Sequence, residues 1–229
     1  PTLRSRHRGH IKIHHGMRHA NAYRQSQSQS QARAAARQTT KSVDAAPAGP
    51  VTIGDPSRAQ KFLSLISKGE GGYNSMNQGT VGKRIVGSTH DSTKVVGKKL
   101  TELSIGEIMD MQKGSLKTGR KLFAVGKYQI IPETMKKVVA MAGLSRDQKF
   151  DEATQEKLGM ALIQKRGKLH DYLTGKSNDE HGAMVEAARE WASLPHPKTG
   201  RSIYGGGNKS SHSVESVRTA LRDTRKDMM

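Results

Sequence analysis

The 229-residue sequence contains no cysteine, which excludes disulfide bonds, thiolate nucleophiles and zinc sites built on cysteine. This absence is typical of a protein made in a reducing cytoplasm. The sequence also lacks any apolar run of about 18 residues, so it predicts no membrane-spanning helix. The N-terminus carries basic residues without a following apolar segment, and we therefore expect no secretory signal.

Aromatic and hydrophobic residues are scarce, at 4% and 33% of the chain, which is little for one core spanning the whole length. The deficit is concentrated in residues 1–43, which contain no Asp or Glu, nine Lys or Arg, and five His. Within them, Ser26 to Gln31 alternates Ser and Gln, a pattern with nothing to bury. We therefore predict a disordered basic arm over 1–43, a Pro/Ala/Gly-rich linker over 44–54 and a folded domain over 55–229.

The histidines of the arm invite a metal-binding interpretation. They alternate with Arg and Lys and have no carboxylate partners, which favours a solvated basic segment over a metal centre. We therefore expect no metal ion and no cofactor. The net charge of +19 predicts a polyanionic partner, either nucleic acid or an anionic cell envelope.

Apolar residues at helical spacing predict a mainly helical domain. Asp55 and Pro56 are typical of a helix start, and the apolar stripe that follows them ends at the glycines after residue 68. Ser104, with Glu107 three residues later, predicts a second helix start with a capping box. Further helices are expected over 132–142, 151–166, 180–192 and 213–225.

Residues 73–99 depart from this pattern. Gly and Thr are frequent there, and glycines separate short apolar runs, so we expect a small β-hairpin region or an irregular loop lobe. The whole predicts an α+β fold with one early helix, a small β lobe and a larger helical lobe. A cleft between the lobes would have Glu70, at the end of the first helix, on its floor.

Glu70 is the strongest candidate for a catalytic residue. It lies in the segment KGEGGYN, where glycines end the first helix directly after the carboxylate. The partial negative charge of a helix C-terminus disfavours a carboxylate, so a purely structural Glu is better placed elsewhere. A carboxyl group held against an apolar wall can have a raised pKa and act as a general acid near neutral pH. The alternative is a Glu that only decorates the helix end.

A second motif, GKYQIIPET over residues 126–134, resembles the G-x-x-Q-x-x-P-x-T pattern of soluble lytic transglycosylases and related lysozymes. Tyr128 offers an aromatic edge, and Gln129 offers an amide to sugar hydroxyl or acetamido groups. The alternative for Gln129 is a buried side chain that bonds local backbone.

Two later segments extend the resemblance. Trp191 to Pro195 reads WASLP, and Tyr204 follows in a glycine-rich loop. With KGEGGYN and GKYQIIP, these segments are similar, in the same order, to phage lysozyme-like muramidases and lytic transglycosylases of the lambda endolysin type. The resemblance covers most of residues 57–225. It implies a lysozyme-like fold and one essential Glu, which corresponds to Glu70. The segment 196–202 is an insertion relative to that pattern.

The resemblance also implies a reaction. Such enzymes cleave the bond between N-acetylmuramic acid (MurNAc) and N-acetylglucosamine (GlcNAc) in peptidoglycan without water, leaving 1,6-anhydromuramic ends. We expect Tyr73, Tyr128, Gln129 and an exposed Tyr204 to contact the sugar. Trp191 is expected in the core, with sugar stacking as the less favoured alternative.

The two possible mechanisms differ in whether a second carboxylate takes part. Asp91 is the candidate for it, because it is the only acidic residue between residues 71 and 101. If Asp91 faces Glu70 across a cleft, a two-carboxylate hydrolytic muramidase follows. If it is a turn residue, the sugar's own 6-hydroxyl or N-acetyl group must act as the internal nucleophile, and Glu70 serves as acid and then as base.

The expected setting is a bacteriophage lysin made in the host cytoplasm without a signal peptide. It would reach the periplasmic cell wall through a holin pore or inside an infecting particle. The basic arm would bind the anionic envelope, nucleic acid or other virion proteins. The competing hypothesis is a virion structural or nucleic-acid-binding protein whose lysozyme-like domain is inactive.

Overall fold

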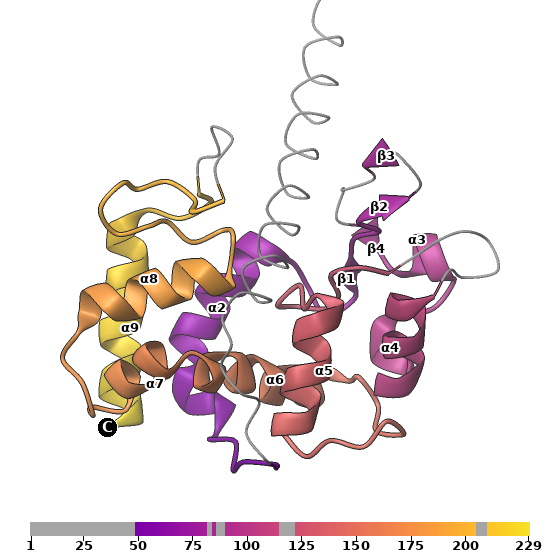
Figure 1. Cartoon of the computed structure of the whole chain (residues 1–229), viewed down its shortest axis with the longest axis horizontal. Helices are drawn as coiled ribbons and strands as arrows, with labels where there is room; N and C mark the ends of the chain where they lie inside the picture. The colour runs from indigo at the N-terminus through magenta and orange to yellow at the C-terminus, as the bar shows by residue number, and fades with distance from the viewer. Residues whose placement is uncertain (1–48, 82–83, 86–89, 115–121, 205–209) are drawn as a thin grey trace, which may run out of the picture.

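The computed structural model describes residues 49–81, 84–85, 90–114, 122–204 and 210–229 (Figure 1). The predictions for the basic arm fall on residues outside these ranges. In chain order the elements are η1 (Pro56–Ala59), α2 (Gln60–Glu70), β1 (Ser75–Met76), β2 (Thr80–Val81), β3 (Arg84–Ile85), β4 (His90–Asp91), α3 (Thr93–Val96), η2 (Leu100–Glu102), α4 (Ile105–Lys113), α5 (Pro132–Met141), α6 (Glu152–Lys165), α7 (Gly167–Leu173), α8 (Glu180–Glu190) and α9 (Val214–Met228).

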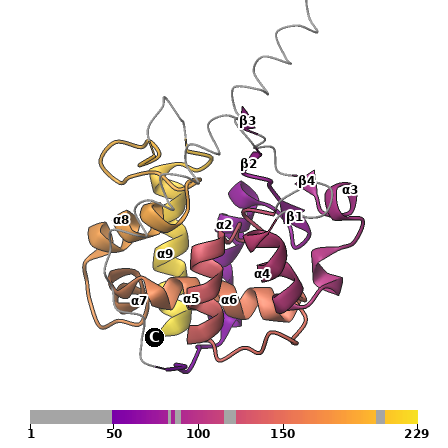
Figure 2. The same cartoon turned by 45° about the vertical axis from the view of Figure 1, so that its right-hand side comes forward.

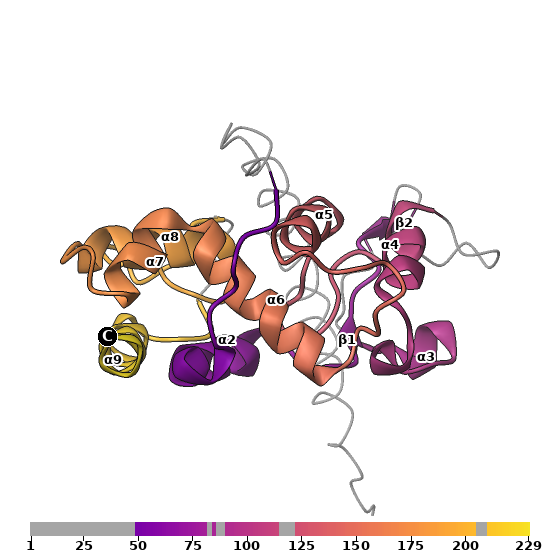
Figure 3. The ribbon, with the colours of Figure 1, turned by 90° about the horizontal axis from the view of Figure 1, so that it is seen from below.

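Helix α6 runs through the middle of the molecule, between two groups of elements (Figures 1 and 3). On one side α7 and α8 pack together, and α9 packs against α2 and α7. On the other side, α5 packs against both α4 and α6. Strands β1 and β4 lie beside α3 (Figures 1 and 2), and α4 lies at the same end of the molecule (Figures 1 and 3). This arrangement agrees with the predicted α+β class, and the finer lysozyme-like assignment stays a prediction.

The first helical segment starts with the cap and the proline that its sequence predicts. The Asp55 side chain accepts a hydrogen bond from the Ser57 N–H at 2.9 Å, and Pro56 fills the first helical position. A short 3-10 turn leads into α2, in which Phe62, Leu63 and Ile66 are fully buried and Leu65 is partly buried. The helix ends at Glu70, because Gly71 has a φ of 154° that L side chains rarely adopt.

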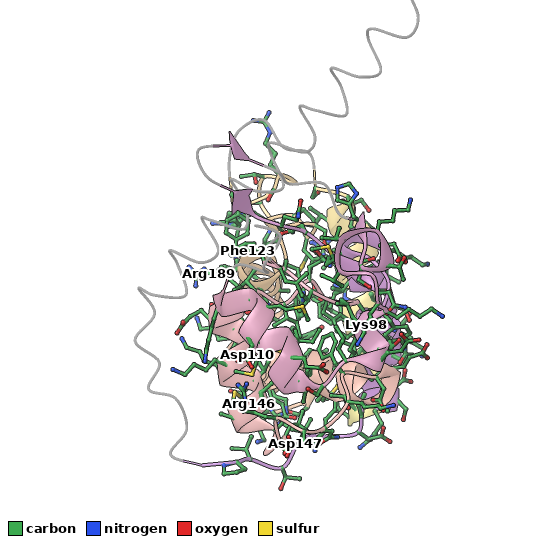
Figure 4. The ribbon with its side chains drawn as sticks, turned by 90° about the vertical axis from the view of Figure 1, so that its right-hand side faces the viewer. Lys98, Asp110, Phe123, Arg146, Asp147 and Arg189 are labelled. Atoms are coloured by element: carbon green, nitrogen blue, oxygen red, sulfur yellow. The ribbon has the colours of Figure 1, made fainter. Side chains whose placement is uncertain are left out.

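Other predicted helix boundaries are also confirmed. Ser104 and Glu107 form the expected capping box at α4. Pro132 occupies the first turn of α5, and the Asp151 side chain caps α6. An ion pair of 2.7 Å between Arg146 and Asp110 ties the loop after α5 to α4, at one edge of the molecule (Figure 4).

Helix α7 was not among the predicted elements. The backbone of Arg166, with φ −97° and ψ 86°, interrupts the helical path after α6. Gly167 then opens a seven-residue helix whose buried residues are Leu169, Tyr172 and Leu173. An apolar stripe this short, placed directly after a glycine, gives little sign of a separate helix. In the sequence it resembles the frayed end of the preceding helix.

The β lobe is confirmed and is small. Strands β1 and β4 pair antiparallel, with Ser75 opposite Asp91 and Met76 opposite His90. Strands β2 and β3 form a second antiparallel pair. Met76 is fully buried, so β1 connects this lobe to the helical core.

Candidate active site

Glu70 stands at the end of a helix that the core holds firmly. Phe62, Leu63 and Ile66 of α2 are fully buried, and the Phe62 ring meets Trp191 edge-on with the ring centroids 5.8 Å apart. Trp191 is 2% exposed, so its expected place in the core is confirmed. The WASLP segment is thus anchored against α2, the helix that carries the candidate acid.

The same segment contacts the Glu70 carboxylate. The Ser193 N–H donates a hydrogen bond to Glu70 Oε1 at 3.2 Å. Gly69 permits this approach, since a Cβ there would lie 2.6 Å from Ser193 Cβ and 2.8 Å from His212 Nε2. Glu70 is partly exposed as a whole, but its carboxyl group is buried. This burial raises the pKa of Glu70, and hydrogen bonding from Ser193 offsets only part of the increase in pKa. The arrangement suits a general acid.

This raised pKa predicts how Glu70→Gln changes stability with pH. A carboxyl group whose pKa is higher in the folded state stabilises the fold fully below its unfolded pKa, and that contribution is lost as pH rises through the folded pKa. The Gln variant keeps the oxygen that accepts from Ser193 and carries no charge. We therefore expect equal melting temperatures near about pH 4 and a higher melting temperature for the variant near about pH 8. A parent protein that melts higher than the variant at both pH values would contradict the raised pKa.

A second polar cluster holds the loops around Glu70 together. Glu156 of α6 accepts hydrogen bonds from the Tyr73 hydroxyl at 2.7 Å and the Tyr128 hydroxyl at 2.8 Å. Lys127 pairs with the same carboxylate at 2.5 Å and also donates to the Tyr73 hydroxyl at 3.3 Å. Burial raises the pKa of Glu156, but Lys127 and the two tyrosines outweigh it, so the pKa lies below its usual range. Tyr73 and Tyr128 therefore both bond to Glu156, and Lys127 bonds to Glu156 and Tyr73. The sequence analysis predicted no role for Glu156 or Lys127.

Gln155, the neighbouring residue on α6, bonds the same two loops through their backbone. Its Nε2 donates to the carbonyls of Tyr73 at 3.1 Å and Phe150 at 3.0 Å, while its Oε1 accepts from the Lys127 N–H at 2.9 Å. Gly126, with a φ of 76°, leaves room for that Oε1, which a Cβ would overlap. Gly126, the glycine that opens the GKYQIIP motif, thus allows the Gln155 side chain to pack close to this backbone.

Gly159 makes room for the Tyr128 ring and predicts a matched pair of variants. A Cβ at Gly159 would lie 2.5 Å from Tyr128 Cε2. Overpacking costs about 1–3 kcal/mol, more than the roughly 1 kcal/mol by which Ala favours a helix, so Gly159→Ala should lower the free energy of unfolding. Gly167→Ala should raise it slightly, because a Cβ there meets no atom within 4 Å. Urea unfolding measures both, and shifts in the same direction would refute the packing argument.

Gln129 uses its amide within the protein. Its Nε2 donates to the carbonyls of Gly126 at 2.9 Å and Ser75 at 3.2 Å, and the Asn77 amide lies 3.5 Å from its Oε1. Its backbone is in the left-handed region, with a φ of 48°. These contacts match the alternative given above, a side chain that bonds local backbone. Since Ser75 Oγ also accepts from the Gly72 N–H at 2.8 Å, Gln129 helps to hold the turn that follows Glu70.

Asp91 has the contacts of a turn residue. It is exposed, and its carboxylate accepts hydrogen bonds from the Thr93 N–H at 2.9 Å and from the Thr93 hydroxyl. The hydroxyl, and then the N–H, hold the pKa of Asp91 below its usual range. Pairing of Ser75 with Asp91 brings β4 beside the turn after Glu70, but this carboxylate is engaged at the start of α3.

The prediction that Tyr204 is exposed is wrong. Only 8% of the residue is accessible, and its hydroxyl donates to the Arg189 carbonyl at the end of α8. Burial raises the pKa of Tyr204, and the nearby carboxylates of Glu190 and Glu70 add to this effect. The glycines after it suggested a solvent-facing loop, whereas the side chain is buried against the end of α8.

Most of the sequence matches one known protein family. A family model described as Endolysin matches residues 60–223, which run from the first residue of α2 into α9. The chain belongs to the endolysin family. Endolysins are phage enzymes that degrade the bacterial cell wall, so peptidoglycan is the substrate class, and the predicted resemblance is confirmed. No curated protein and no solved structure gives a significant match.

The described residues offer neither a metal site nor a membrane-spanning helix. No group of three or more His, Asp or Glu side chains in this part of the chain is arranged to hold a metal ion. None of the helices that the structure describes combines the length and apolar character needed to cross a bilayer.

Proposed function

We propose that the chain cleaves the β-1,4 bond between MurNAc and GlcNAc as a lytic transglycosylase, with Glu70 as its general acid and base. The observation that carries this proposal is the enclosed Glu70 carboxyl group, whose pKa is raised, in a chain of the endolysin family. Its position in the last turn of α2 and its hydrogen bond from Ser193 support a fixed orientation toward substrate.

In the proposed reaction, protonated Glu70 donates its proton to the glycosidic oxygen as the bond from C1 of the muramoyl unit to that oxygen breaks. The 6-hydroxyl of the same muramoyl unit attacks C1 and forms the 1,6-anhydro ring. The Glu70 carboxylate takes the hydroxyl proton and returns to its acid form. No water is consumed, and no second carboxylate is required.

A hydrolytic muramidase that uses Glu70 and Asp91 is the alternative mechanism. The bonds from Thr93 to Asp91 support the single-carboxylate route, because a carboxylate that caps a turn is less available to activate water. An inactive virion protein is the other alternative. Retention of an enclosed carboxyl group with a raised pKa, a costly feature without a function, argues against it.

Around Glu70 we propose separate roles for the remaining candidates. The partly exposed Tyr73, held by Lys127 and Glu156, is best suited to contact a sugar ring. Tyr128, Gln129 and Tyr204 act as positioning residues, since their polar groups are already bonded within the protein. The basic arm is proposed to hold the enzyme on anionic envelope or nucleic acid, with release by a holin pore or delivery within a virion.

Mass spectrometry of the fragments released from purified peptidoglycan tests the proposed function. Transglycosylation yields anhydromuropeptides, which are lighter by one water than the reducing-end muropeptides of a hydrolase. Anhydro ends as the main product support the proposal. Reducing MurNAc ends would establish the hydrolytic alternative, and the absence of any fragment would favour the inactive virion protein.

A further inference from the structure

The loop between α8 and α9 carries a hollow that the proposed cleavage does not use. Its volume is about 570 Å³, and it is largely open to solvent. Among the residues that the structure describes, the hollow is lined by five from this loop: His196, Thr199, Arg201, Ser202 and Ile203. They combine a cation, an imidazole and hydroxyls with one apolar residue, a lining that suits an anionic ligand with an apolar part.

The backbone of this loop is fixed by its own hydrogen bonds. The His196 N–H donates to the Arg201 carbonyl at 2.8 Å, and the His196 carbonyl accepts from Thr199 at 3.2 Å and Gly200 at 2.9 Å. The Lys198 N–H donates to His196 Nδ1 at 3.2 Å. A ligand entering the hollow therefore meets a formed turn and loses little free energy to ordering it.

The hollow is positively charged. None of its lining residues is acidic, and the exposed Arg201 guanidinium has no ion-pair partner among the residues that the structure describes. Lys198 is exposed on the same turn, and the His181 ring stands edge-on to His196 with the centroids 6.2 Å apart. Glu186 and Glu190 of α8 are paired with Arg166, which lies between α6 and α7, and Glu186 also pairs with Arg189 of α8. An unpaired cation beside an open hollow attracts carboxylate or phosphate.

The loop that carries the hollow starts beside the proposed acid. Ser202 Oγ donates to the Ala192 carbonyl at 3.0 Å, and the next residue, Ser193, donates its N–H to Glu70 at 3.2 Å. The upper end of α2 and the start of this loop accordingly lie together in Figure 1. A substrate that reaches Glu70 therefore meets the segment from which this loop starts.

We infer that the hollow binds the anionic stem peptide of the muramoyl unit, with Arg201 pairing with a stem carboxylate. This inference rests on the proposed function. The peptide is attached to the same sugar whose C1 reacts, so it must leave the site within a short distance of Glu70. Stem peptides carry free carboxylates and small apolar side chains, which match the charge of Arg201 and the apolar surface of Ile203. Phosphates of other envelope polymers lack this tether to the reacting sugar.

The test compares the full-length parent, Arg201→Gln and the control Lys136→Gln, an exposed cation on α5. Each is assayed on purified sacculi, on sacculi whose stem carboxylates have been amidated, and on glycan strands stripped of peptide. We expect Arg201→Gln to lower kcat/KM about tenfold on native sacculi and to match the parent on the other two substrates. Lys136→Gln should match the parent on all three. An equal loss on all three substrates, or no loss on native sacculi, overturns the inference.

A binding measurement separates this inference from the proposed cleavage. The probe is the free tripeptide L-Ala-γ-D-Glu-meso-diaminopimelate, added to the full chain while backbone amide shifts are followed by NMR. Saturable shifts confined to residues 196–203, and weakened in Arg201→Gln, support the site even if the chain cleaves no glycan. Absence of these shifts, or equal shifts with inorganic phosphate at the same concentration, overturns it.

Discussion

Replacing Glu156 by Ala is expected to lower the free energy of unfolding by about 3 kcal/mol, the usual scale for removing one partner of a buried ion pair. The Lys127 and Glu156 side chains are only 12% and 17% exposed and lie 2.5 Å apart. The variant leaves the Lys127 ammonium without its carboxylate and removes the acceptor of the Tyr73 and Tyr128 hydroxyls. Urea unfolding followed by circular dichroism measures the change.

Two further variants make this prediction specific. Glu152→Ala removes an exposed carboxylate from the first turn of the same helix and should cost less than about 1 kcal/mol. Lys127→Met combined with Glu156→Met should recover part of the loss, because no unpaired charge then remains. If Glu156→Ala and Glu152→Ala destabilise equally, the cluster does not hold the loops.

The helix boundaries were predictable because the signals for them are local. Asp55, Ser104, Asp151 and Ser213 each cap a helix through their own side chain, within three residues in sequence. The end of α2 at Glu70 followed from the glycines after it for the same reason. A capping bond does not depend on the rest of the fold, so a single sequence reveals it.

The roles of the site side chains depend on distant contacts and were less predictable. Glu156 and Lys127 are 29 residues apart, and in the sequence Glu156 reads as one more solvated residue of α6. Gln129 fits its motif, yet the motif does not say whether the amide faces a sugar or the Ser75 carbonyl 54 residues away. Tyr204 lies next to glycines, which indicated exposure, but tertiary packing buries it.

Glu70→Gln is expected to lower kcat/KM on peptidoglycan by about 10²–10⁴-fold, the contribution of a positioned general acid. The amide is nearly isosteric, and its oxygen still accepts from Ser193, so the fold around residue 70 is retained. It cannot donate a proton to the glycosidic oxygen or accept one from the 6-hydroxyl. The loss is therefore chemical, and the variant should still bind the cell wall.

Asp91→Asn is the matched control. Asn can cap the same turn toward Thr93 without a charge, so the transglycosylase account predicts little change in rate. A loss comparable to that of Glu70→Gln would show that two carboxylates act together, and it would favour the hydrolytic muramidase.

The most direct measurement is the initial rate at which soluble glycan fragments leave purified peptidoglycan, with parent and Glu70→Gln at equal concentrations of folded protein. We expect steady release by the parent and release by the variant at no more than about one hundredth of that rate. Release by Glu70→Gln at the rate of the parent would contradict the central claim that the Glu70 carboxyl group performs the cleavage.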